Sequence, residues 1–109
     1  MKTKIPTTKL TGETDKEAER KKFNIVHNKG FHITLKNGWT VSVQFGWGNY
    51  CDNYNNKPEE LKNYGMIPYS SNTAEVWAWK NDVTYPNGPK GYQTPEEVLK
   101  FINKVSKKK

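Results

Sequence analysis

The sequence FHITLKNGWTVSVQF, residues 31–45, decides the fold of this chain. Apolar and polar residues alternate on both sides of Asn37-Gly38. The apolar members are Phe31, Ile33 and Leu35 before it and Trp39, Val41, Val43 and Phe45 after it. Successive side chains of a strand point to opposite faces, and Asn-Gly accepts the positive φ angles of a type I′ turn. The pattern therefore predicts an antiparallel hairpin with one apolar and one polar face.

Further strands are predicted on both sides of this hairpin. Apolar residues in 23–27, followed by the turn formers of 28–30, indicate a short preceding strand and hence a three-strand meander. Residues 74–79 alternate small apolar side chains with a glutamate and two tryptophans, which predicts another strand. The turn formers at 81–82 then lead into residues 83–85, which favours a second hairpin.

One amphipathic helix is predicted near the C-terminus. Thr94-Pro95-Glu96-Glu97 has the pattern of a capping box with proline at the first helical position. An apolar stripe follows at helical spacing, formed by Val98, Leu99, Phe101, Ile102 and Val105. A single helical turn is also expected at 58–62. The predicted fold class is α+β: an antiparallel sheet of four to five strands, in two hairpins, with the C-terminal helix packed on its apolar face.

The length of 109 residues allows one domain. We assign that domain to residues 23–105. Residues 1–22 contain little apolar surface to offset the entropy of ordering, which predicts a flexible basic and polar arm with some helix over 15–22. Residues 106–109 are interpreted as a lysine tail.

The positive charge lies at the two ends of the chain. The formal net charge is +7, yet residues 31–99 carry five Lys against seven Asp and Glu. A folded surface that grips phosphates would show clustered Lys and Arg, so the pattern favours at most weak nonspecific contact of nucleic acid with the tails. The apolar runs are far too short for a membrane helix, and the mean hydropathy is -1.00. A soluble, cytoplasmic protein is expected.

The single cysteine limits the possible chemistry. Cys51 excludes an intrachain disulfide and Cys-rich zinc sites. A neighbouring His27 or His32 would activate its thiol, and a small Cys-dependent hydrolase is therefore one hypothesis. The spacing of these three residues does not match known metal sites. We expect no metal and no cofactor.

The loop region 46–56 combines aromatic residues with Gly and Asn. The chain has four Trp and six Tyr, more than a core of this size needs. Rigid rings flanked by amides are typical of binding surfaces, and the same rings can stack on nucleic-acid bases. The alternative is a second small core on the far side of the sheet. The predicted partner-binding residues are Trp47, Asn49, Tyr50, Asp52, Tyr54, Trp77 and Trp79.

Over about residues 31–105 the sequence resembles small uncharacterised proteins of bacteriophages and prophages. The segments that carry the resemblance are NGWTVSVQ at 37–44, GNYCDN at 48–53, AEV at 74–76 and TPEEV at 94–98. The resemblance implies a viral or mobile-element origin. Small phage accessory proteins commonly bind and block a host enzyme, including restriction and CRISPR nucleases.

Three functions are expected, in order of preference. The first is a non-enzymatic phage-type accessory protein that binds and inhibits a host protein in the cytoplasm of an infected bacterium, with anti-CRISPR or anti-restriction activity. The second is a nucleic-acid or nucleotide binder that uses aromatic stacking and the basic tails. The third is the Cys-dependent hydrolase.

Overall fold

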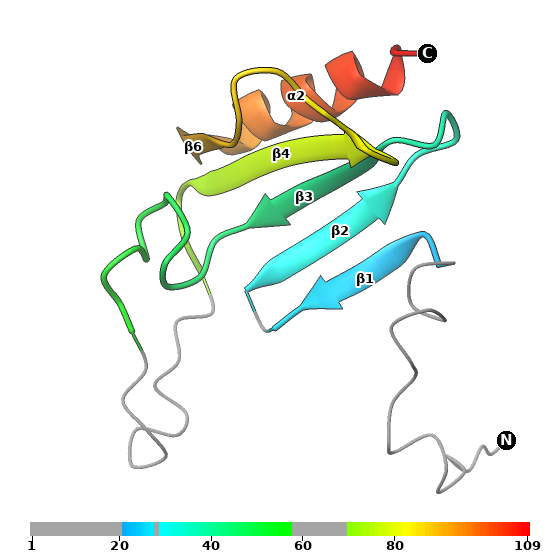
Figure 1. The fold of residues 1–109 in the computed structure, drawn as a ribbon. Helices are drawn as coiled ribbons and strands as arrows, with labels where there is room; N and C mark the ends of the chain where they lie inside the picture. The colour runs from blue at the N-terminus through cyan, green and yellow to red at the C-terminus, as the bar shows by residue number, and fades with distance from the viewer. Residues whose placement is uncertain (1–20, 28, 58–69) are drawn as a thin grey trace, which may run out of the picture.

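The computed structural model describes residues 21–27, 29–57 and 70–109. One antiparallel sheet carries a helix on one face (Figure 1). The elements are β1 (Phe23–Val26), β2 (Gly30–Thr34), β3 (Thr40–Gln44), β4 (Ala74–Lys80), β5 (Val83–Thr84), β6 (Lys90–Gln93) and α2 (Pro95–Ser106). The strands lie in the order β1-β2-β3-β4, and β5 and β6 pair with different parts of β4. The predicted α+β class is confirmed.

The central hairpin of β2 and β3 forms as predicted, but with a different turn. Of its two turn residues only Gly38 has a positive φ, +93°. The Gly38 N–H donates to Leu35 O at 2.9 Å, and the Leu35 N–H donates to Trp39 O at 2.7 Å. These bonds describe a three-residue loop that ends in a glycine bulge, so the predicted type I′ turn is wrong.

The side chain of Asn37 accounts for this turn. Its Nδ2 donates to Val105 O and Lys108 O, both at 2.9 Å, and its Oδ1 accepts the Trp39 N–H at 3.1 Å. The turn residue therefore binds the C-terminal end of α2, 68 residues or more away in the chain.

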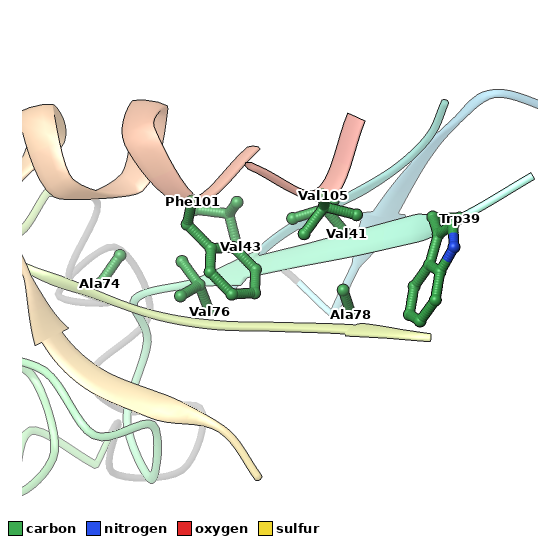
Figure 2. Packing of buried hydrophobic residues seen from close by; sticks show 8 residues of the cluster. All are labelled: Trp39, Val41, Val43, Ala74, Val76, Ala78, Phe101 and Val105. Atoms are coloured by element: carbon green, nitrogen blue, oxygen red, sulfur yellow. The ribbon is translucent and has the colours of Figure 1, made fainter. Parts of the chain in front are cut away.

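The core lies between α2 and the adjacent face of β3 and β4 (Figure 2). Strand register places Val41 opposite Ala78 and Val43 opposite Val76, so these side chains share that face. The buried residues are Trp39, Val41, Val43, Ala74, Val76, Ala78, Phe101 and Val105. Burial of each valine contributes roughly 1.5–3 kcal/mol.

Helix α2 begins at the predicted capping box. The Glu97 N–H donates to Thr94 Oγ1 at 3.2 Å, and the Thr94 N–H donates to Glu97 Oε1 at 2.8 Å. Phe101 and Val105 of the predicted apolar stripe are buried. Leu99 is 60% exposed, so its predicted place in the core is wrong.

Strand β6 was absent from the prediction, which ended the second hairpin before it. Its sequence does not alternate, and it packs against the loop after β3. The Tyr92 N–H donates to Tyr50 O at 2.8 Å. At Gly91 an added Cβ would lie 2.5 Å from Tyr50 Cβ, so this position admits only glycine. The strand pairs with β4 and also hydrogen-bonds the distant loop at Tyr50.

The C-terminal lysines pack on the body of the domain. Trp39 Nε1 donates to Lys109 O at 3.4 Å. The Lys108 ammonium lies 5.4 Å from the Trp39 ring centroid and 5.2 Å from that of Tyr85. The backbone of the expected lysine tail is thus held at the hairpin turn.

Two predicted segments lie outside the described residues: the helical turn at 58–62 and nearly all of the N-terminal arm, residues 1–20. Within the described part of the chain, no helix is long and apolar enough to cross a membrane.

Candidate functional site

The loop that follows β3, residues 46–56, is here called the aromatic loop. Its middle alternates between inside and outside: Asn49, Cys51 and Asn53 are buried, whereas Tyr50 and Tyr54 are exposed. In a sheet, a neighbouring strand would bind the backbone N–H and C=O groups of such a segment. In this loop the buried side chains form hydrogen bonds with nearby backbone groups instead.

Asn49 holds the first part of the loop against the sheet. Its Oδ1 accepts the Gly46 N–H at 2.9 Å. Its Nδ2 donates to Gln44 Oε1 at 3.3 Å and to Glu75 Oε1 at 3.1 Å. All of these groups belong to this chain, so the side chain of Asn49, predicted to contact a partner, anchors the loop.

Asn53 holds the second part of the loop. Its Nδ2 donates to Phe45 O at 2.8 Å and to Ser70 O at 2.9 Å. Its Oδ1 accepts the Asn56 Nδ2 at 2.8 Å. One buried amide thereby joins the two ends of the segment between β3 and β4.

Asp52 ties the exposed side of the loop to the segment before β4. Its carboxylate accepts the Thr73 hydroxyl at 2.8 Å and the Asn72 N–H at 3.2 Å. The Asp52 N–H donates to Thr73 Oγ1 at 3.0 Å. The predicted partner residue Asp52 is exposed, and it already stabilises the shape of the loop.

Cys51 is 1% exposed. Its thiol donates to Gly46 O at 3.5 Å and accepts the Asn53 N–H at 3.4 Å. In the described part of the chain neither partner is an imidazole: His27 is exposed, and the ring contact of His32 is with Trp79 on the sheet. The geometry required for an activated thiol is not present there.

Three aromatic side chains of the loop are exposed: Trp47 (39%), Tyr50 (52%) and Tyr54 (41%). The rings of Tyr50 and Tyr54 stack, with centroids 5.4 Å apart and planes inclined by 8°. Tyr92 of β6 is 54% exposed and its backbone is bonded to Tyr50. We call Trp47, Tyr50, Tyr54 and Tyr92 the aromatic loop surface.

Two lysines accompany Trp47. The ammonium groups of Lys29 and Lys57 lie 5.3 Å and 5.2 Å from its ring centroid. Lys29 comes from the turn before β2, and Lys57 follows the loop. Neither lysine nor Tyr92 was among the predicted partner-binding residues. Lys29 and Tyr92 reach this surface only in the folded chain, whereas Lys57 is next to the loop in the sequence.

Trp77 and Trp79 lie on the sheet face opposite α2 and are only partly exposed. Their ring centroids are 6.1 Å apart, and Trp79 meets His32 edge to face at 5.0 Å. Trp77 Nε1 donates to Tyr85 O at 3.3 Å. Burial lowers the pKa of His32 from its ordinary value. The two tryptophans thus pack against each other and His32 on this face, and their partner-binding role stays a prediction.

Among the residues that the structure describes, no group of three or more His, Cys, Asp and Glu could hold a metal ion. No family model, curated protein or solved structure matches the chain.

Proposed function

We propose that this protein is a protein-binding module that presents the aromatic loop surface to a partner. The observation that carries the proposal is the rigid support of exposed rings: Asn49 and Asn53 are buried and bonded, while Tyr50 and Tyr54 are exposed above them. A loop already held in shape loses little entropy on binding. Tyrosine and tryptophan at such positions contribute more to interfaces than most residues do.

The surroundings of Trp47 indicate the partner's chemistry. Lys29 and Lys57 place positive charge beside the Trp47 ring. An interface with an apolar centre and an acidic rim complements this arrangement.

The finer proposal is a phage-type accessory protein that inhibits a host defence nuclease, of the CRISPR or restriction kind, in the cytoplasm of an infected bacterium. Its support is the resemblance of residues 31–105 to phage proteins. The nucleic-acid groove of a nuclease is basic, and two lysines at the aromatic loop surface would be repelled there. We therefore expect binding to an acidic, apolar patch of the nuclease.

Affinity capture from bacterial lysate tests the proposal. Immobilised protein is treated with nuclease before elution, beside a Trp47→Ala/Tyr50→Ala variant and a Val83→Ala control. Val83 is also an exposed apolar residue, 59%, but on β5. We expect one stoichiometric protein that survives nuclease, is retained by the control and is lost with the double variant. Against the purified partner, the double variant should bind about 30-fold or more weakly. Equal capture by all three proteins would refute the proposal.

A single-stranded nucleic acid is the second candidate, favoured by the two lysines beside Trp47. Against it, Tyr50 and Tyr54 cover one face of each other, which leaves less ring surface for bases. Fluorescence anisotropy with a labelled oligonucleotide over a salt series distinguishes the two candidates. Nucleic-acid binding predicts a steep loss of affinity with salt, reduced in slope by Lys29→Gln and Lys57→Gln.

We also propose that the protein is not an enzyme. The burial of Cys51 with backbone partners counts against one class of enzyme, the Cys-dependent hydrolase. Cys51 should react with iodoacetamide only in the small fraction of molecules that are unfolded, and so far more slowly than an exposed thiol. Rapid alkylation of the folded protein would return the Cys-dependent hydrolase to consideration.

A further inference from the structure

Strand β1 is an edge strand, and its backbone bonding pattern shows which groups point outward. The Thr34 N–H donates to Lys22 O at 2.8 Å, so Lys22 and Thr34 form a hydrogen-bonded pair. Such pairs alternate along an antiparallel ladder. Lys22, Asn24 and Val26 therefore bond to β2, whereas the N–H and C=O groups of Phe23 and Ile25 point away from it. In the described part of the chain, no strand pairs with this outer edge.

The side chains of the same two residues are exposed. Register places Phe23 opposite Ile33 and Ile25 opposite Phe31, on the sheet face that carries α2. The helix packs over β3, β4 and β6, and Figure 1 shows β1 at the edge of the sheet farthest from the helix. Phe23 is consequently 71% exposed and Ile25 85%. Exposed apolar side chains above an unpaired edge favour strand addition.

We call the exposed side chains of Phe23 and Ile25 the apolar strip. An apolar groove continues this strip toward the helix. It has a volume of about 310 Å³ and is lined mainly by apolar residues, among them Phe31, Phe45, Val98, Leu99 and Ile102. Phe31 is the cross-strand neighbour of Ile25, so the strip and the groove meet. The apolar surface thus extends from the outer edge of β1 to the exposed Leu99 of α2.

We propose that β1 pairs with β1 of a second copy of this chain, which joins two sheets into one across a two-fold axis. The outward groups of Phe23 and Ile25 determine the register. When Asn24 lies opposite Asn24 of the second copy, Phe23 lies opposite the second copy's Ile25 and exchanges both backbone hydrogen bonds with it. Both helices then lie on the same side of the joined sheet, with the apolar strips between them.

The register is self-complementary in side chains as well as in backbone. Phe23 and Ile25 form cross-strand apolar pairs in both directions. Lys22, which precedes β1, lies opposite Val26, so the Lys22 side chains of the two copies do not face each other. A strand partner from another protein would need to supply these features by coincidence, whereas a second copy has them by symmetry.

The area and the charge set the strength of this dimer. A specific interface buries at least about 1,000 Å² in total. Each copy offers a strip with two exposed apolar side chains, Phe23 and Ile25, so we expect a weak dimer. Each copy carries a formal charge of +7, so the copies repel at low ionic strength. We expect dissociation at about 10–100 µM in moderate salt and a tighter dimer as salt increases. This association does not depend on the aromatic loop surface.

Sedimentation velocity of the full chain from about 5 to about 500 µM tests the proposal. The Ile25→Lys variant should be at least about tenfold weaker in dimerisation, because the lysine enters the apolar strip. Val83→Lys on β5 is the matched control and should dimerise as the unmodified chain does. Thermal unfolding of both variants checks that they remain folded. A monomer at every concentration, or a dimer unaffected by Ile25→Lys, would overturn the proposal.

Two further measurements test the register. Amide hydrogen exchange should slow with increasing protein concentration at Phe23 and Ile25 and remain unchanged at Asn24, which already bonds to β2. An Asn24→Cys variant should form an intermolecular disulfide readily, because opposed residues of a non-hydrogen-bonded pair lie about 4.5 Å apart at Cα. Val26→Cys, opposite Lys22 in this register, is the control. Faster cross-linking of Val26→Cys, or a dimer whose exchange at Phe23 and Ile25 does not change, would contradict edge pairing through β1.

Discussion

Replacement of Asn53 by alanine should destabilise the protein by about 2–3 kcal/mol. Asn53 is 5% exposed and donates to Phe45 O at 2.8 Å and to Ser70 O at 2.9 Å. A typical hydrogen bond contributes about 1 kcal/mol net, and a buried carbonyl left without a donor costs about 1–3 kcal/mol. Only the Phe45 carbonyl is expected to pay a penalty for a lost donor, because Ser70 is exposed and water can reach its carbonyl. This keeps the expected total near about 2–3 kcal/mol.

Urea unfolding measures this change. The midpoint should fall while the slope with denaturant stays the same, since the surface exposed on unfolding does not change. Asn55→Ala is the matched control: Asn55 is exposed, two residues away, and should change stability by less than about 0.5 kcal/mol. The same Asn53→Ala variant should bind the partner more weakly, because its aromatic loop is less ordered. A loss of stability below about 1 kcal/mol would refute the anchoring role of the side chain.

Three further changes test the fold. Val105→Ala, in the core, should cost about 2–3 kcal/mol in urea unfolding, whereas Leu99→Ala, at 60% exposure on the same helix, should cost less than about 0.5 kcal/mol. Thr94→Ala removes the capping box and should lower the unfolding free energy by about 1 kcal/mol, with reduced helicity in circular dichroism. Burial lowers the pKa of His32 below 6.5, so the folded state binds its proton less readily than the unfolded chain. Stability should therefore decrease as the pH falls from about 6.5 toward the lowered pKa, and His32→Gln should reduce this decrease. Unfolding midpoints at several pH values would decide the point.

Local patterns predicted most of the fold. The alternation around Asn37-Gly38, the strand at 74–79 and the capping box at Thr94 were each confirmed. These features depend on neighbouring residues: the two-residue period of a strand and the bonds of a helix N-terminus act within a few positions. For the same reason the positions of β1, β5 and α2 in the sequence could be predicted from short segments of the chain.

The candidate site was only partly predictable. Composition indicated that Trp47, Tyr50 and Tyr54 lie in a binding loop, and the structure exposes all three. Composition did not distinguish these rings from Asn49, whose side chain turned inward because Gln44 and Glu75 lie beneath it.

The sequence by itself determined the α+β class, the strands that alternate and the start of the helix, because these depend on contacts within one segment. Only the tertiary structure decided which residues of an apolar stripe are covered and which segments meet. Leu99 is exposed because α2 lies over β3 and β4, and β6 meets the aromatic loop at Gly91, where an added side chain would clash with Tyr50. Burial depends on the position of the whole helix over the sheet, and a pairing between residues 50 and 92 depends on the folded path of the chain between them.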